Sequence, residues 1–251
     1  MAMNPMEQFV VKPLIEAPLF SIGSHPIYFT NQALFMIIAV VLATLFLTLT
    51  VSKNRLVPTR GQSMAELSYE FVGSMINSTM GHDGLKFFPL IFTIFVFVLF
   101  QNFLGLVPWT FTATSQIAIT FTLASFVILV MIVVGFMKHG LRFFSLFVPH
   151  APWYLLILLV PIEVISFLTR PISLSVRLFA NMLAGHTLLA VFASFVVLLG
   201  AAGGIMSVVS VAPFLLIVAI FALEMLVAAL QAYVFAILTC IYLNDAIHPG
   251  H

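Results

Sequence analysis

Long apolar runs without a single charged residue dominate this sequence. The stretches 87–107 and 115–137 contain no Asp, Glu, Lys or Arg, and the stretch from 153 to 243 is almost entirely apolar. Only 7% of all residues are charged, whereas soluble globular domains carry roughly 25%. A soluble fold has no room to bury so much apolar surface. We therefore expect an integral membrane protein built from hydrophobic helices.

Charge and cysteine content exclude several other classes. The formal net charge is +1, so we expect no nucleic-acid partner. Cys240 is the one cysteine, which rules out an internal disulfide. Residues 1–18 lack the basic start, apolar centre and small-residue cleavage site of a signal peptide, so we expect this segment to remain.

The apolar runs predict an all-α membrane protein organised as a single membrane domain. Each of the three expected transmembrane spans is long enough to cross a hydrocarbon core of about 30 Å; they are 32–51, 87–107 and 115–137. Between the first two, apolar residues recur at helical spacing opposite Glu66, Glu70 and Asn77. These are Met64, Leu67, Phe71, Met75 and Ile76. This pattern predicts an amphipathic helix over 60–80 that lies at the membrane interface.

The distribution of basic residues predicts the orientation. Lysines and arginines follow the first and third spans, whereas the loop 108–114 has none; they are Lys53, Arg55, Arg60, Lys86, Lys138 and Arg142. The positive-inside tendency places 52–86 and 138–152 on the cytoplasmic or matrix side. The N-terminal segment 1–31 is then outside and the C-terminus inside.

Two long apolar arms, 153–202 and 205–243, follow the third span and are separated by Gly203 and Gly204. Arms of this length reach roughly 60 to 75 Å as straight helix, whereas the hydrocarbon core is about 30 Å thick. The arms must therefore tilt steeply, lie along the membrane or break, with Pro171 as a breaking point. We expect them to form a membrane-embedded helical hairpin.

Several polar side chains lie inside these arms, where an arginine or acid costs about 2.5 to 3.5 kcal/mol at the centre of a span. They are Glu163, Arg170, Arg177, Asn181, His186, Glu224 and Gln231. In an antiparallel hairpin that turns at the glycine pair, these residues form pairs at the same height along the two arms. Arg177 then lies level with Gln231, His186 with Glu224, and Glu163 with Asp245. This arrangement predicts a ladder of titratable groups with a permanent cation between them.

Purely structural roles are the alternatives for the same residues. Arg177 could be a partner in an ion pair, and Arg170 could anchor its helix by snorkelling or be neutralised by Glu163. Asn181 and Gln231 could be hydrogen-bonding links between helices. His186 could equally be a packing residue.

Sequence motifs in both arms resemble subunit a of the rotary F-type ATP synthase. The first motif runs from Arg170-Pro171-Ile172-Ser173-Leu174 to Arg177-Leu178-Phe179-Ala180-Asn181-Met182 and ends at Gly185-His186. The second is Leu230-Gln231-Ala232-Tyr233, and the second span adds Gln101-Asn102-Phe103-Leu104-Gly105 with Pro108. The resemblance covers essentially the whole chain.

This resemblance implies a proton-conducting stator subunit that is not an enzyme on its own and binds no nucleotide, cofactor or metal. Arg177 would face the membrane carboxylates of a rotating ring of c subunits. Two offset half-channels would carry protons: His186, Glu224, Asn181 and Gln231 on the outer side, and Glu163 with Asp245 on the inner side. Other partners would be subunit b of the peripheral stalk and the lipid bilayer.

Some points stay open at this stage. Many bacterial relatives in that family have Glu at the position of His186 and His at that of Glu224, so either member of the pair could be the last proton donor. The exchanged pair suits a bacterial plasma membrane of alphaproteobacterial type or a mitochondrial inner membrane. Two rival functions are a secondary transporter with a small-molecule site at Arg177 and Glu224, and a membrane scaffold.

Overall fold

The computed structural model describes residues 9–15, 20–22, 25–51, 58–107, 110–140, 143 and 153–248. All the candidate site residues lie in these ranges. Lys53, Arg55 and Arg142, on which the predicted orientation partly depends, lie outside them, as do Pro108 and much of the segment 1–31.

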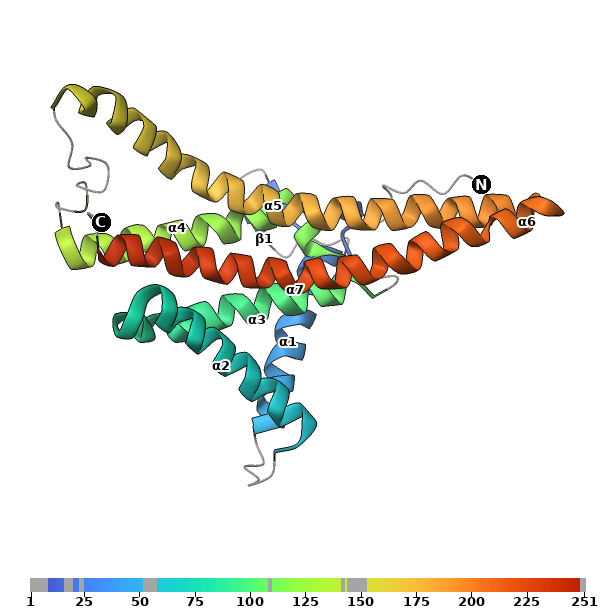
Figure 1. The fold of residues 1–251 in the computed structure, drawn as a ribbon, viewed down its shortest axis with the longest axis horizontal. Helices are drawn as coiled ribbons and strands as arrows, with labels where there is room; N and C mark the ends of the chain where they lie inside the picture. Colours follow the sequence, from blue (N-terminus) through green and yellow to red (C-terminus); the bar gives the residue numbers. More distant parts are fainter. Residues whose placement is uncertain are drawn as a thin grey trace. The chain divides into compact units, whose positions relative to one another are not determined.

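Helices make up most of the described chain (Figure 1). Those that overlap the three expected spans are α1 (Asn31–Val51), α3 (Phe88–Gly105) and α4 (Ile117–His139). The polar stretch forms α2 (Arg60–Met80) and the 3-10 helix η2 (Gly81–Phe87), and a second 3-10 turn, η3 (Ala113–Ser115), precedes α4. The two arms form α5 (Trp153–Ala201), α6 (Ile205–Val209) and α7 (Val211–Ile247).

The expected class is confirmed, because 5 helical stretches of the described residues are long and apolar enough to cross a membrane. They are Asn31–Thr50, Arg60–Gly105, Ile117–His139, Tyr154–Ala201 and Ile205–Ile247. The sequence did not predict one small feature, an antiparallel pair of 3-residue strands, β1 (Phe20–Ile22) and β2 (His25–Ile27).

The chain divides into two compact units, and four helices contribute to both. The first unit comprises Met1–Leu42, Leu99–Gln116 and Leu178–Gln231. The second comprises Ala43–Val98, Ile117–Arg177 and Ala232–His251. The candidate residues His186 and Glu224 belong to the first unit, whereas Glu163, Arg170 and Asp245 belong to the second.

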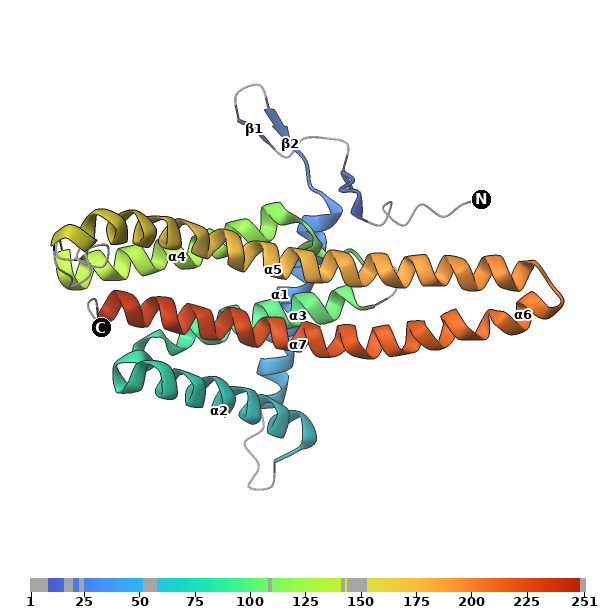
Figure 2. The ribbon, with the colours of Figure 1, turned by 45° about the horizontal axis from the view of Figure 1, so that its top comes forward.

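A tight antiparallel hairpin forms the main part of the first unit. Figures 1 and 2 both show the end of α5 running beside the start of α7, with α6 at the tip. Gly203 and Gly204 make the turn with φ angles of 69° and 60°, a left-handed conformation that residues with a Cβ rarely adopt. The expected turn at these two glycines is confirmed.

The second unit has an apolar core to which five helices contribute. Its fully buried side chains include Val72, Ile91, Met131, Leu174 and Leu243, from α2, α3, α4, α5 and α7 respectively. The few polar side chains buried with them are hydrogen-bonded: the hydroxyls of Thr120 on α4 and Ser175 on α5 lie 3.1 Å apart.

The apolar stripe expected on α2 divides between two faces of the helix. Met75 and Ile76 are buried, whereas Met64, Leu67 and Phe71 are 61%, 64% and 44% exposed. The buried face also contains Gln62, Ala65, Val72 and Met80. The apolar residues on α2 therefore point in two directions, one toward the core and one away from it.

Helix α5 continues without interruption through Pro161 and Pro171 and spans 49 residues. At 1.5 Å per residue it is roughly 74 Å long, more than twice the thickness of a hydrocarbon core. Within the second unit its first turns diverge from the last turns of α7 (Figure 1). Of the three alternatives for the arms, a complete break at Pro171 is thus wrong.

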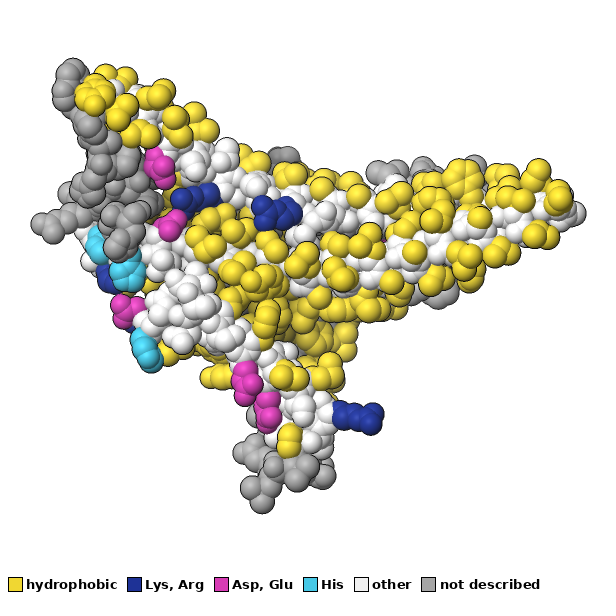
Figure 3. All heavy atoms as spheres, viewed as in Figure 1, with side chains coloured by type: hydrophobic (Ala, Val, Ile, Leu, Met, Phe, Trp, Pro, Cys, Tyr) yellow, Lys and Arg dark blue, Asp and Glu magenta, His cyan; other side chains and the backbone are white. Residues whose placement is uncertain are grey.

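Hydrophobic side chains cover most of the face in Figure 3, including the length of α5 and α7 toward the tip. Between Arg177 and Glu224 the sequence has no Asp, Glu, Lys or Arg. The hairpin end of the first unit is therefore suited to an apolar environment.

Candidate functional site

A cavity of about 660 Å³ lies in the first unit, between the N-terminal segment, the loop after α3, and the two arms of the hairpin. Most of its lining is apolar, and its polar side chains are few: Lys12, Asn31, Thr110, Thr112 and His186. Such a cavity, open at one side and with a histidine in its wall, can hold water next to a proton-accepting group.

The N-terminal segment is tied to this cavity by backbone contacts. Asn31, the first residue of α1, accepts a hydrogen bond from Lys12 N at 3.1 Å and donates one to the Val10 carbonyl at 3.3 Å. Gln116 Nε2 donates to the Phe9 carbonyl at 2.8 Å. The Phe9 ring packs edge-on against His186, with ring centroids 6.4 Å apart. Residues near the start of the chain thus form one wall of the cavity.

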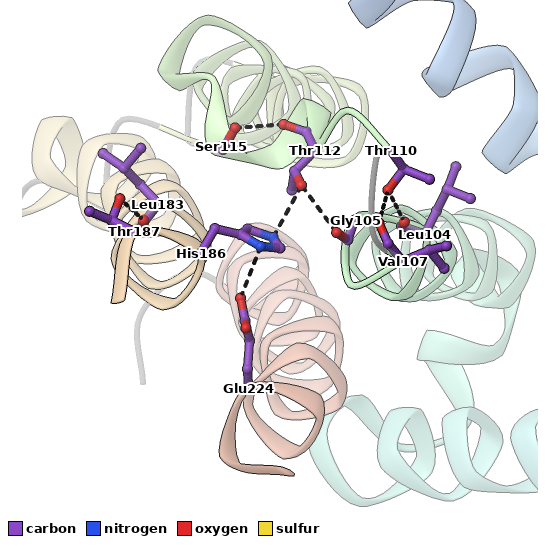
Figure 4. A network of polar contacts seen from close by, with 10 residues as sticks. All are labelled: Leu104, Gly105, Val107, Thr110, Thr112, Ser115, Leu183, His186, Thr187 and Glu224. Atoms are coloured by element: carbon purple, nitrogen blue, oxygen red, sulfur yellow. Dashed lines mark hydrogen bonds and ion pairs between the residues drawn. The ribbon is translucent and has the colours of Figure 1, made fainter. Parts of the chain in front are cut away.

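His186 lies between two polar groups that come from different elements (Figure 4). Its Nδ1 is 3.5 Å from Glu224 Oε1 on α7, and its Nε2 is 3.1 Å from the hydroxyl of Thr112 in the loop before η3. The side chains of His186 and Glu224 are 11% and 3% exposed. The structure thus brings together the two residues that the hairpin register set level.

Glycine makes room for the Glu224 carboxyl group. A Cβ atom at Gly185 would lie 2.6 Å from Glu224 Oε1 and 2.9 Å from its Cδ, closer than real Cβ atoms approach. Neither oxygen of Glu224 has a hydrogen-bond partner among the described residues. Buried polar atoms are normally paired with protein or water, so the carboxyl group is placed to exchange protons with His186 or with water.

Two neighbouring amide side chains, Gln101 and Asn102, lie on the part of α3 that belongs to the first unit. Asn102 Nδ2 donates to the Ala228 carbonyl of α7 at 3.2 Å, which links the two helices. Gln101 is fully buried, and neither of its side-chain amide atoms has a hydrogen-bond partner among the described residues. Asn102 Oδ1 also lacks one. These atoms are further candidates for contact with buried water.

Asn181 and Gln231, the other predicted residues of the outer side, are less engaged. Asn181 is half-buried on α5 and Gln231 is 7% exposed on α7. Neither side chain makes a hydrogen bond to another residue that the structure describes. The role of links between helices, which was one alternative for this pair, therefore has no hydrogen bond to support it within the described chain.

In the second unit Asp245 contacts Arg170 rather than Glu163. Arg170 Nη1 donates to Asp245 Oδ2 at 2.9 Å, and the guanidinium also lies over the rings of Tyr242 and Phe167 at 5.2 and 5.9 Å. Glu163 makes no hydrogen bond or ion pair to a described residue. Glu163, which the hairpin register set level with Asp245, makes no polar contact with it, because α5 diverges from α7 there and the long Arg170 side chain reaches Asp245.

Arg177 is exposed on α5 and has no hydrogen bond or ion pair with any residue that the structure describes. Its neighbours one turn away on α5 are the apolar Leu174 and Ala180 and the polar Ser173 and Asn181. The alternative in which Arg177 is a structural ion-pair partner inside this chain therefore finds no support among the described residues. An exposed permanent cation thus lies on a helix that is apolar along most of its length.

Sequence reasoning missed Thr112 and Gln101. Thr112 lies in an uncharged loop, and its contact with His186 joins residues 74 apart in the chain, so no local pattern could reveal it. The apolar run of the second span contains Gln101 next to Asn102, and this polar pair was a usable signal. Among the described residues no group of three His, Cys, Asp or Glu side chains could hold a metal ion.

A family model described as "ATP synthase A chain" matches residues 33–244. The chain belongs to this family. The match begins at the start of α1 and covers Glu163, Arg177, His186 and Glu224, and it ends one residue before Asp245. Phe9 and Lys12, which line the cavity, precede it.

Similar chains agree with this membership over their full lengths. An ATP synthase subunit a of Mesorhizobium japonicum is 56% identical over 249 residues, which cover 99% of this chain and 98% of the relative. One from Nitrobacter hamburgensis is 55% identical, with 99% and 100% covered. One from Sinorhizobium medicae is 54% identical, with 100% and 99% covered. The ATP synthase A chain family thus accounts for the whole chain, including the N-terminal wall of the cavity.

Proposed function

We propose that this chain is the proton-conducting stator subunit of an F-type ATP synthase. Two offset half-channels deliver protons to and from the carboxylates of the c-ring, and Arg177 separates them. Protons that cross in this way drive rotation of the ring, which is coupled to ATP synthesis elsewhere in the complex. Membership in the ATP synthase A chain family supports proton transport and ATP synthesis in a membrane.

The unpaired, exposed position of Arg177 is the observation that carries this proposal. An arginine side chain stays protonated in proteins, and an unpaired charge in hydrocarbon is costly. Arg177 lies on a largely apolar helix and has no counter-ion among the described residues. A carboxylate of the c-ring would supply this counter-ion.

The charge of Arg177 explains how such a subunit prevents a leak. A proton cannot pass through a guanidinium group by relay, because that group does not lose its own proton. Arg177 also attracts an ionised ring carboxylate and favours its deprotonation. A protonated carboxyl group turns into lipid far more easily than an ionised one. Each charge that crosses the membrane potential supplies about 2.3 kcal/mol per 100 mV.

The outer half-channel uses the cavity of the first unit. His186 lies in its wall, and Glu224 is the next titratable group beyond it. Asn181 and Gln231 would bind water on the way to the ring. The buried amide of Gln101 and the unpartnered oxygens of Glu224 support a hydrated path, because dry burial of such groups costs roughly 1 to 3 kcal/mol each.

The inner half-channel uses Glu163 and Asp245 in the second unit. Asp245, which accepts a hydrogen bond from Arg170 and is half-buried, would pass protons that leave the ring toward the inner side. Glu163 has no hydrogen bond or ion pair within the described chain and lies closer to the start of α5 than Arg170 does.

Membrane placement follows the same proposal. The N-terminus lies outside and the C-terminus inside a bacterial plasma membrane, α2 lies at the interface with its exposed apolar residues in lipid, and α5 and α7 tilt steeply. Subunit b of the peripheral stalk holds the chain against rotation.

The test is proton pumping by the complete enzyme in vesicles. Arg177→Lys should abolish coupled ATP synthesis, because a lysine is a compact charge that can lose its proton when buried. Arg177→Ala should in addition allow passive proton leak. Arg60→Ala removes an exposed arginine from the start of α2 and should leave both activities unchanged. Wild-type ATP-driven pumping by Arg177→Ala would refute the proposal.

A further inference from the structure

Thr112 is a buried residue that joins the C-terminal end of α3 to His186. Thr112 is 5% exposed. Its hydroxyl donates to the Gly105 carbonyl at 3.4 Å and lies 3.1 Å from His186 Nε2 (Figure 4). One hydroxyl group therefore contacts both a carbonyl, which can only accept, and an imidazole nitrogen, which can donate or accept.

The single proton of the hydroxyl limits the direction of the second contact. A hydroxyl has one proton and two lone pairs. The Gly105 carbonyl can only accept, and it has no partner within α3 because it belongs to the last turn of that helix, so we assign the Thr112 proton to it. With this assignment the hydroxyl accepts from His186 Nε2. Nε2 then carries the proton of a neutral His186, and the lone pair lies on Nδ1.

This tautomer aims the basic nitrogen at the acid. Nδ1 faces Glu224 Oε1 at 3.5 Å, and the Glu224 oxygens have no other protein partner among the described residues. When His186 is an imidazolium, its Nδ1–H bond breaks as an O–H bond forms at Glu224 Oε1, which leaves a protonated carboxyl group and a neutral His186 with its proton on Nε2. If the neutral ring kept its proton on Nδ1 instead, the proton would leave from Nε2 and Glu224 would receive none.

The surrounding chain fixes Thr112 in place. Ser115 Oγ donates to the Thr112 carbonyl at 2.6 Å, which holds the loop from the other side. A Cβ atom at Gly105 would lie 2.7 Å from Thr112 Cγ2 and 2.8 Å from its hydroxyl oxygen. Glycine at position 105 is therefore what lets the Thr112 side chain lie against the end of α3.

We propose that Thr112 is a positioning residue, which holds the Nε2 proton of His186 so that the proton that the ring passes on leaves from Nδ1 toward Glu224. This inference rests on the proposed proton path, and it adds the specific residue that prepares the histidine for transfer. The geometry of four groups carries it: the Gly105 carbonyl, the Thr112 hydroxyl, the His186 ring and the Glu224 carboxyl.

The first experiment measures the tautomer itself in the assembled enzyme. Nitrogen-15 NMR of histidine-labelled enzyme in liposomes distinguishes protonated from unprotonated ring nitrogens, and a His186→Gln sample identifies the signals of His186. Wild type and Thr112→Ser should show a protonated Nε2 and an unprotonated Nδ1. Thr112→Val, which keeps the shape but has no hydroxyl, should show a substantial Nδ1–H population. An unchanged tautomer in Thr112→Val would overturn the inference.

The second experiment measures proton-driven ATP synthesis in the same vesicles. Thr112→Val should reduce the rate about fivefold or more, the usual consequence of losing one hydrogen bond of this kind, and Thr112→Ser should restore most of it. The matched control is Thr187→Val, because Thr187 follows His186 directly and its hydroxyl bonds to Leu183 of its own helix at 2.7 Å. That variant should keep the wild-type rate.

The two readouts separate the possible failures. A changed tautomer with a normal rate in Thr112→Val would show that the tautomer does not matter for transfer, and this would also overturn the inference. Co-purification of each variant with the c-ring excludes loss of assembly as the cause of a low rate. Failure of the proposed function itself would appear elsewhere, as normal pumping by Arg177→Ala.

Discussion

Glu224 has an unusual environment for a carboxyl group on a membrane helix. It is 4% exposed as a residue, and its nearest polar neighbour is His186 Nδ1 at 3.5 Å. Burying a carboxyl group with so few partners is unfavourable for stability. The proposed proton path accounts for this cost, and the cavity beside His186 would give protons access to the pair.

Replacing either member of the pair tests whether protons pass through it. His186→Gln and Glu224→Gln should each slow proton-driven ATP synthesis, since an amide does not titrate, while the double swap His186→Glu with Glu224→His should restore part of the rate. Because interacting groups titrate as a pair, we also expect altered pH profiles. The rates are measured in reconstituted vesicles over a range of outside pH. Lys12 is the other charged group that lines the cavity.

The opposite result has a clear meaning. If the two residues only hold α5 and α7 together, glutamine at either position preserves packing and most of the flux. Near-normal rates with unchanged pH profiles in both single variants would show that the outer path does not run through His186 and Glu224. Asn181, Gln231 and water would then be the remaining route.

Sequence alone located His186 and Glu224 but not their whole environment. The pair follows from a cost argument and from the turn at the glycines, both of which depend only on position along regular helices. The contact between Thr112 and His186 depends on how an irregular loop folds back on α5. The contact between Asp245 and Arg170 depends on how far α5 diverges from α7. A helical period in the sequence predicts neither contact.

Among the elements, α5 most departs from simple expectation. Two prolines interrupt its hydrogen bonding, yet the helix continues through both. In an apolar environment an unwound segment would expose more unpaired backbone groups than a proline does, so a continuous helix is preferred. Helix α2 shows a second limit of sequence-based prediction. Apolar residues at helical spacing do not indicate which of them pack against the protein and which stay exposed.

Close packing of α5 on α7 yields a test at Gly185. In Gly185→Ala the new methyl group would come within 2.6 Å of Glu224 Oε1, so the flexible carboxyl group must move away from His186. The enzyme should still assemble, but proton-driven ATP synthesis should fall severalfold.

Gly200→Ala is the matched control for that change. No atom lies within 4 Å of a Cβ atom at Gly200 on the same helix. This variant should keep the wild-type rate and gain up to about 1 kcal/mol of helix stability. ATP synthesis by Gly185→Ala at the wild-type rate would show that the position of the Glu224 carboxyl group is not important for transfer.

For the whole molecule, composition and apolar runs predicted the membrane class and the extents of most helices. The prediction succeeded because lipid leaves few alternatives to apolar helices. The small strands β1 and β2 were not predicted, because strands of three residues are too short to show a detectable period in the sequence. The sequence could suggest a cation at Arg177, but its exposure depends on the packing of the other helices.

A density map of the complete enzyme, with this subunit beside its ring, tests the central claim most directly. The surface of α5 that carries Arg177 should face the ring, with the guanidinium within about 4–6 Å of a ring carboxylate, the range in which an opposite charge favours the ionised form. The cavity beside His186 should open to the outer side only. A map in which Arg177 faces lipid, or is ion-paired to a residue of this same chain, would contradict the claim.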